Sequence, residues 1–418
     1  ALYIRQAQSL VDGDPARVAA ENEFTVTASR GAAFTPPLYP WGFPAILAPF
    51  VAVVGADLDR LVIVPVLSAV VFACCWFDLV RRRLGTFAGF VAVVALTMTP
   101  LLVGWTELIQ SEWPFMAVTS VVLVGLDRLA TTDRLLGPAV RLWPLILLGA
   151  GTAASFSIRR EGIGLVAAVA AAQLVVLVPA LSQRSWARGA IAGRAIAPHA
   201  TALAIVLAIQ AMLPSTLVPS YEGTGVANVW RFADDHVQHL AEVVGIKRPW
   251  DADTVVLGSA VIGTLVLVGL GIAALAGLVL AVGPHRRRDA HLAAYAIVAF
   301  VVGASFRVPI NRYVCTVAPI LLLFALTAVK WSAERVVHDE RRSTRVASAL
   351  PVAILLAIAA GNLANVHVRL DRTAAFAEAG QVEWGPTHPD SIAMFEQVVA
   401  LTDPSDVVGA PKARAMVL

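Results

Sequence analysis

The sequence predicts an all-α polytopic membrane protein, and three observations support this fold class. Of the 418 residues, 58% are hydrophobic and 15% are charged, and the mean hydropathy is +0.74. Soluble globular domains have roughly 45–50% apolar and about 25% charged residues. Apolar runs of about 20 residues, the length of a membrane-crossing helix, recur along the chain. Arginines gather in alternate loops between these runs, as membrane topology requires.

Ten apolar segments are expected to cross the membrane as helices. They lie near residues 60–79, 85–105, 113–127, 141–158, 163–182, 197–216, 255–283, 289–306, 310–329 and 346–366. The third is short, and 255–283 is long enough to tilt. Segment 38–56 contains Pro40, Pro44 and Pro49 together with several aromatic residues. Because proline disturbs a helix interior, we expect a juxtamembrane or re-entrant helix there.

The distribution of Lys and Arg predicts the orientation of the bundle. One set of alternate loops holds 17 basic residues, around 81–83, 128–141, 184–194, 286–288 and 330–345, and the opposite short loops hold 7. The richer set is expected to be cytoplasmic. The protein is therefore predicted to be a multi-pass plasma-membrane protein with residues 1–59, 217–253 and 367–418 outside.

Three regions follow from this topology. Residues 1–59 form an outer juxtamembrane loop, and residues 60–366 form the transmembrane helical domain with its outer loop at 217–253. Residues 367–418 are predicted to begin a small extracytoplasmic α/β domain, because two short apolar runs flank a turn at Gly409 and Pro411. An outer N-terminal segment needs a preceding span, so we expect further sequence before Ala1, and more of the soluble domain after Leu418.

Composition gives little support to nucleic-acid or metal chemistry. The net charge of +3 comes from arginines that topology already explains, so we predict no nucleic-acid partner. The three cysteines have neither disulfide nor metal-ligand spacing. His236 and His239 lie three residues apart but have no placed carboxylate beside them. The sequence therefore predicts no metal site.

Candidate functional residues gather on the predicted outer side. In "TELIQSEWPF", Glu107 and Glu112 lie at the junction of two spans. A carboxylate in low-dielectric surroundings can serve as a general base. The alternative is an interfacial turn with solvated acids, which Ser111 and Pro114 would favour as helix-start residues.

Arginines on the predicted outer side run against the topological trend and need another explanation. Guanidinium groups hold phosphate by paired hydrogen bonds, so they indicate an anionic headgroup, although Arg–Glu pairs can also merely stabilise a loop. The substrate-binding candidates, from "SIRREG" and "FRVPINRYV", are Arg159, Arg160, Glu161, Arg307, Arg312 and Tyr313.

Tyr39 is a further substrate-binding candidate, in the proline-rich segment "TPPLYPWGFP". Consecutive prolines make this segment rigid, and its aromatic side chains suit the membrane interface. Tyr39 is therefore either an interfacial anchor or a stacking surface for a sugar.

Five segments, in this order and spacing, resemble the C superfamily of membrane glycosyltransferases, which includes protein O-mannosyltransferases and aminoarabinose transferases. The segments are "ALYIRQAQSLVDGDP", "TPPLYPWGFPAILAPFVAVVG", "QSEWPFMAVTSVVLVGLDRL", "SIRREGIGLVAAVAA" and "NRYVCTVAPILLLFAL". The resemblance covers most of the chain, and the ordered set carries more weight than any single motif. By it, Glu112 matches a recurrent acid, Arg160 and Glu161 match a polar pair, and Arg312 and Tyr313 match an Arg-Tyr pair.

The resemblance implies a glycosyltransferase that moves a sugar from a polyprenyl-phosphate donor to a lipid, glycan or protein acceptor on the outer face. Arginines would neutralise the phosphate leaving group while a carboxylate deprotonates the acceptor hydroxyl. The family's principal acid precedes the residues that match Ala1, so Glu112 is expected to be a base or an accessory group. The resemblance leaves open the sugar, the acceptor and any requirement for a divalent cation.

Two other classes stay open. A membrane glycan polymerase or ligase shares the donor chemistry and the large outer loop. A secondary transporter would predict repeats, broken helices and ionisable residues near mid-membrane. The sequence contains no evident internal repeat.

Overall fold

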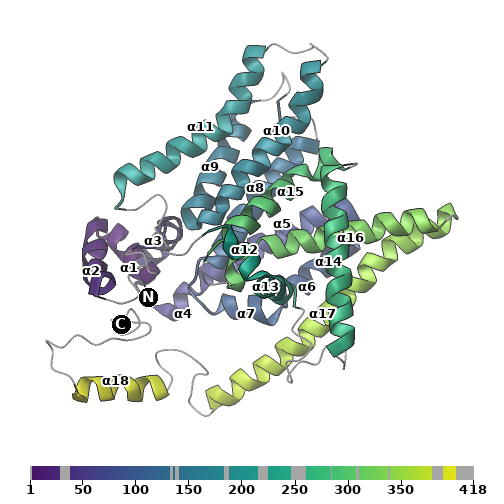
Figure 1. The fold of residues 1–418 in the computed structure, drawn as a ribbon. Helices are drawn as coiled ribbons and strands as arrows, with labels where there is room; N and C mark the ends of the chain where they lie inside the picture. Colours follow the sequence, from purple (N-terminus) through teal and green to yellow (C-terminus); the bar gives the residue numbers. More distant parts are fainter. Residues whose placement is uncertain are drawn as a thin grey trace.

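The computed structural model describes residues 2–28, 38–131, 135–136, 141–182, 188–214, 225–245, 260–283, 285–306, 310–337, 339–378 and 389–401. Every regular element in these ranges is a helix, which confirms the all-helical part of the predicted fold class (Figure 1). In chain order the helices are α1 (Leu2–Val11), α2 (Pro15–Ala28), α3 (Gly42–Val54), α4 (Leu58–Leu61), α5 (Ile63–Leu84), α6 (Thr86–Thr97), α7 (Pro100–Thr106), α8 (Glu112–Thr131), α9 (Leu142–Ile158), η2 (Arg160–Ile163), α10 (Gly164–Ser182), α11 (Arg188–Met212), α12 (Ala227–Arg231), α13 (Ala233–Val243), α14 (Ala260–Val282), α15 (Arg286–Ala304), η3 (Asn311–Tyr313), α16 (Val317–Val336), α17 (Glu340–Glu378) and α18 (Pro389–Leu401).

Six segments of the described chain are long and apolar enough to cross a membrane, or seven if the bent pair α6–α7 counts as one. These six are Leu58–Leu84, Glu112–Thr131, Arg160–Val178, Ile191–Met212, Val317–Val336 and Arg342–Phe376. Helix α9 has 17 residues, fewer than any of these six segments. The helices are therefore compatible with a polytopic membrane protein, whereas a total of ten spans is not confirmed.

Helix α8 lies at the centre of the bundle, where it packs against α5, α9, α10 and α15. Helix α8 is 20 residues long, whereas the sequence predicted a short third span over 113–127. Its interior stripe carries Glu112, Thr119 and Asp127, all at most 1% exposed. Spacings of seven and eight residues bring these side chains onto one face of a 3.6-residue helix.

Buried ion pairs hold the C-terminal end of α8. Arg83, at the end of α5, lies 2.6 Å from Asp127 Oδ1 and 2.8 Å from the Oδ1 of Asp289 on α15. Its backbone carbonyl accepts a hydrogen bond of 3.1 Å from Lys330 on α16. We call these four residues the Arg83 cluster. Its three buried charges join α5, α8 and α15, and the hydrogen bond from Lys330 adds α16.

The segment predicted as one span over 85–105 is two helices, α6 and α7, bent by 70°. Helix α6 ends at Thr97. Thr99 is extended and caps α7, where its hydroxyl oxygen accepts the Leu102 N–H at 3.2 Å. Pro100 follows at the first position of α7, where its missing N–H costs nothing. Because proline disfavours helical geometry in the preceding residue, the sequence Thr99-Pro100 breaks the span.

The two terminal regions are also helical where they are described. The N-terminal region forms α1 and α2, where only an outer loop was predicted, and the 13-residue α3, which lies within the segment 38–56 predicted as a juxtamembrane or re-entrant helix. These three helices gather beside the bundle (Figure 1). Helix α17 continues through residue 367 to Glu378, so the domain boundary expected there lies inside a helix. The short apolar runs expected after residue 405 lie outside the described residues.

Candidate functional site

The candidate site is built around Glu112, the first residue of α8, whose side chain is buried. Two guanidinium groups approach the same carboxylate oxygen. Arg159 Nη1 donates a hydrogen bond to Glu112 Oε1 at 3.0 Å, and Arg312 Nε lies 3.0 Å from that oxygen. The other oxygen, Oε2, is buried and has no hydrogen-bond partner in the described part of the chain.

Arg159 is held on several sides at the C-terminal end of α9. Its Nη2 and Nε donate to Glu161 Oε1 at 2.8 and 3.3 Å, and Nη1 lies 3.5 Å from Ser111 Oγ. Its guanidinium also lies over the rings of Tyr313 and Phe115, at 5.4 and 5.7 Å from their centroids. Only 5% of the side chain is exposed, so Arg159 is a buried residue that holds Glu112 and Glu161 in position.

Arg312, in η3, has different surroundings. Its side chain is 31% exposed, and within the described residues its one ion pair is with Glu112. The Nε–H is not aligned for a hydrogen bond with Oε1, so the attraction is electrostatic only. The Nε atom of Arg312 is buried, but the side chain as a whole is partly open to solvent, in contrast to that of Arg159.

Tyr3 connects the N-terminal helix to this cluster, and sequence reasoning did not single it out. Its ring stacks on Tyr39 at 4.6 Å, and its hydroxyl donates to Ser111 Oγ at 3.1 Å. The Gln6 side chain fixes the backbone of Tyr39 with two hydrogen bonds, of 3.0 and 3.2 Å. Burial and the charge of Glu112 raise the pKa of Tyr3, so its hydroxyl remains a donor.

A second aromatic pair lies on the η3 side of the cluster. Phe306 stacks on Tyr313 with a centroid distance of 4.5 Å. A Cβ at Gly303 would lie 2.6 Å from the Tyr313 carbonyl oxygen, so glycine permits this approach of η3 to α15. Burial raises the pKa of Tyr313 against the opposing effect of Arg159 and Arg312, and its phenol stays protonated.

A layer of buried hydroxyl groups lies among α8, α9, α15 and α16. Thr119 and Ser155 are 2.8 Å apart through their Oγ atoms, and the Tyr295 hydroxyl donates to Thr316 Oγ1 at 2.6 Å. The seven-residue spacing from Glu112 to Thr119 is the signal in the sequence that predicts this layer. These hydroxyl groups are hydrogen-bonded to one another, and Thr119 lies on the same face of α8 as Glu112.

The other candidates from the sequence are not all in this cluster. Arg160 turns away, and its guanidinium lies 4.7 Å from the centroid of the Phe156 ring. Glu107 pairs with Arg369 on α17 at 3.3 Å. Arg307 lies outside the described residues. The structure thus brings together Glu112, Arg159, Glu161, Arg312 and Tyr313, with Tyr39 joined to them through Tyr3.

Helix α13 is linked to the site through Glu242. Its carboxylate receives hydrogen bonds from Gln238 at 2.7 Å and from Asn311, the neighbour of Arg312, at 3.3 Å, and His239 lies 3.3 Å away. Burial raises the pKa of Glu242, but these hydrogen bonds outweigh it and the net direction is downward. Among the described residues, no group of three His, Cys, Asp or Glu side chains is suited to hold a metal.

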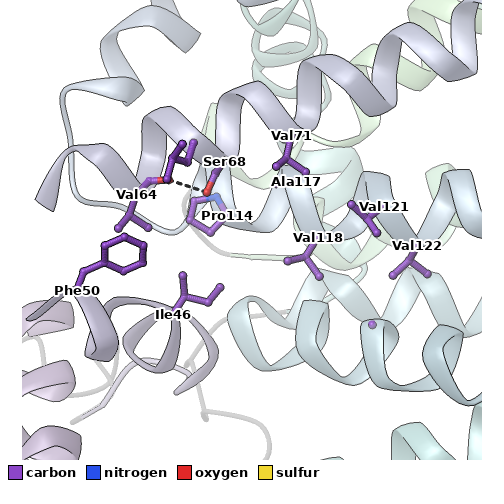
Figure 2. A pocket seen from close by; sticks show the side chains of 12 residues that line it. Ile46, Phe50, Val64, Ser68, Val71, Pro114, Ala117, Val118, Val121 and Val122 are labelled. Carbon is purple, nitrogen blue, oxygen red and sulfur yellow. Dashed lines mark hydrogen bonds between the residues drawn. The ribbon is translucent and has the colours of Figure 1, made fainter. Parts of the chain in front are cut away.

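An apolar pocket of about 310 Å³ lies between α3, α5, α8 and α9 (Figure 2). Figure 2 shows Ile46 and Phe50 facing the α8 residues Pro114 and Val118 across this space. The Ser68 hydroxyl donates to its own helix, at Val64 O, so it offers no hydrogen bond to the pocket. The α8 residues of the pocket lie on the face opposite Glu112, since positions two apart on a helix are about 200° apart.

Comparison of the chain with family models, with curated proteins and with solved structures finds no match. The family resemblance described above therefore stays an expectation.

Proposed function

We propose that this protein is a membrane glycosyltransferase that transfers a sugar from a polyprenyl-phosphate donor to a lipid, glycan or protein acceptor. The proposal includes a plasma-membrane location with ten spans and an extracytoplasmic active site at the Glu112 end of α8. The observation that carries it is the convergence of Arg159 and Arg312 on Glu112 Oε1. A group suited to bind phosphate, Arg312, would thereby lie in direct contact with a group suited to accept a proton, Glu112.

The roles follow from the surroundings of each residue. Arg312, whose side chain is partly exposed, would bind the donor phosphate and stabilise its charge as the sugar leaves. Glu112 would accept a hydrogen bond from the acceptor hydroxyl and assist its deprotonation, as a base or as an accessory to one. Arg159 and Glu161 would hold Glu112 in place.

The prenyl chain and the sugar of the donor also have candidate positions near the Glu112 end of α8. The apolar pocket is of a size suited to part of a prenyl chain, since small-molecule pockets hold roughly 300–1,000 Å³. Headgroup and chain would have to pass around the start of α8, because the pocket and Glu112 occupy opposite faces. Tyr39, which is partly exposed and stacks on Tyr3, is the candidate surface for the sugar, whereas the Tyr313 ring already contacts Phe306 and Arg159.

The test is transfer of radiolabelled sugar from polyprenyl-phosphate donors in membranes that contain the protein. We expect a labelled product in the native protein and a loss of about 100-fold in Arg312→Ala, since removing one charge-stabilising donor typically costs 10²–10³ in rate. Arg369→Ala, which removes another arginine from the same end of the bundle, is the matched control. Unchanged transfer in Arg312→Ala would contradict the phosphate role, and analysis of product length would separate a single-sugar transferase from a polymerase.

A secondary transporter is the second candidate, because the α6–α7 break is a feature of that class. At this break, however, the Ala95 carbonyl accepts a hydrogen bond of 2.7 Å from Asn362. The freed backbone group is thus already satisfied inside the protein. Sugar uptake by proteoliposomes in the absence of any transfer product would favour the transporter.

A further inference from the structure

The two arginines that approach Glu112 differ in burial and in the number of their contacts. Arg159 is buried, makes hydrogen bonds to Glu112 and Glu161, and lies over two aromatic rings. Arg312 is partly exposed and has one ion pair, without an aligned hydrogen bond. An anion arriving from solvent therefore competes for Arg312 and not for Arg159.

A phosphate can compete effectively for such a guanidinium. It offers several oxygens to the planar fork of Arg312, whereas Glu112 offers it one oxygen and poor alignment. Exchange of Arg312 from carboxylate to phosphate removes one of the two groups that occupy Glu112 Oε1. The space beside that oxygen, and the negative charge that Arg312 had balanced, then become available to another group, such as a hydroxyl.

We infer that the Arg312–Glu112 pair is a substrate-operated switch, in which a lipid phosphate takes Arg312 and thereby releases Glu112 to receive the acceptor hydroxyl. This inference rests on the proposed function and adds an order of events: the donor binds first and creates the acceptor site. The groups that face Glu112 are Tyr3 and Ser111, Arg159 with Glu161, Arg312, and Cys315. Of the two arginines, Arg312 is the partly exposed one, so it is the group that an outside anion would draw away.

The switch makes an unusual prediction about affinity. If Glu112 competes with phosphate for Arg312, removing its charge must tighten phosphate binding. A merely structural Glu112 that holds Arg312 ready for the ligand would give the opposite sign, because its loss would weaken binding. The sign of the change therefore distinguishes the two roles.

The experiment is a calorimetric titration of the purified protein with farnesyl phosphate, a short prenyl phosphate, in detergent micelles. We expect Glu112→Gln to bind about fivefold more tightly than the native protein, which corresponds to about 1 kcal/mol for one partly exposed ion pair. Arg312→Ala should bind more weakly. Glu107→Gln is the matched control, because it removes a carboxylate paired with Arg369 at the same end of the bundle and should leave binding unchanged.

The outcomes separate the switch from the function on which it rests. Weaker or unchanged binding in Glu112→Gln, with Arg312→Ala still impaired, overturns the switch and leaves the phosphate site intact. No binding in the native protein and in Glu112→Gln overturns both. Equal behaviour with inorganic phosphate would identify a free anion and not a lipid headgroup as the ligand.

A second measurement uses the unsubstituted protein, in case Glu112→Gln does not fold. Farnesyl phosphate should change the carboxylate stretching bands in the infrared difference spectrum, because Glu112 Oε1 loses the Arg312 contact. The change should be absent in Arg312→Ala, which lacks the exchanging group. An identical spectrum in the two proteins would overturn the switch.

Discussion

Arg159 and Arg312 contact the same oxygen of Glu112, yet their environments give them opposite roles. Arg159 is enclosed and balances two buried carboxylates, Glu112 and Glu161. Arg312 lies at the edge and can exchange partners. Removing one partner from a buried charge cluster is costly because the remaining charges lose their compensation, whereas partly exposed pairs contribute little.

We therefore predict that Arg159→Ala lowers the free energy of unfolding by about 3–5 kcal/mol, and that Arg312→Ala lowers it by at most about 1 kcal/mol. Thermal and chemical unfolding in detergent micelles, followed by circular dichroism, would measure both. Equal losses in the two variants would show that Arg312 is as structural as Arg159.

Glu242 provides a prediction for pH at the residue scale. Its folded-state pKa is lowered, so its contribution is present above the ordinary Glu range and is lost as pH falls through the folded-state value. Native protein should be more stable than Glu242→Gln by about 1 kcal/mol at pH 7, as expected for hydrogen bonds to a charged group. The difference should begin to shrink as the pH falls through the ordinary Glu range of about 4.3, and should vanish only below the lowered folded-state pKa. A difference that persists in acid would mean that the charge of Glu242 is not involved.

Sequence reasoning identified most members of the charged cluster but not its geometry. Ionisable groups at helix ends on the side with fewer basic residues are not explained by membrane topology, so the sequence indicates a functional role for them. These candidates are Glu112, Arg159, Glu161 and Arg312. Tyr3 was not a candidate, since its contact with Ser111 joins positions 108 residues apart, which no local pattern predicts.

At the scale of elements, the break between α6 and α7 depends on the Thr99-Pro100 pair. The Thr99 side chain caps α7, and Asn362 on α17 satisfies the Ala95 carbonyl near the end of α6. A hydropathy criterion cannot detect this break, because the residues on both sides of it are apolar and the whole stretch is long enough for one span. Hydrogen-bond accounting around the proline would have indicated it.

We predict that Thr99→Ala lowers stability by about 1 kcal/mol, the usual contribution of a Thr cap. Thr97→Ala is the matched control, because the Thr97 hydroxyl only donates to Val93 O within α6 and caps nothing. Unfolding in detergent would compare the two variants. A larger loss in Thr97→Ala would contradict a capping role for Thr99.

At the scale of the whole molecule, the charged groups separate into two ends along α8. Glu112 and Asp127 are 15 residues apart, about 22 Å along a helix. The Arg83 cluster lies beside the arginine-rich loops, and the Glu112 cluster lies at the end with fewer basic residues. From the distribution of basic residues, we predict that the Arg83 end is cytoplasmic.

This orientation can be tested with single cysteines in a background that lacks Cys74, Cys75 and Cys315. Trp230→Cys, in α12, and Val336→Cys, at the end of α16, replace exposed side chains. A membrane-impermeant maleimide should label the first in intact cells and the second only after permeabilisation. Labelling in the reverse order would invert the topology and remove the outer active site.

The position of ion pairs at both ends of α8 constrains how this protein can move. Turning α8 about its axis, or sliding it by one turn, would separate Glu112 from Arg159 and Asp127 from Arg83 in the same step. The combined penalty is large because both sets of charges are buried. If the protein changes conformation when it binds a ligand, we therefore expect α8 to keep its position and the surrounding helices to move relative to it.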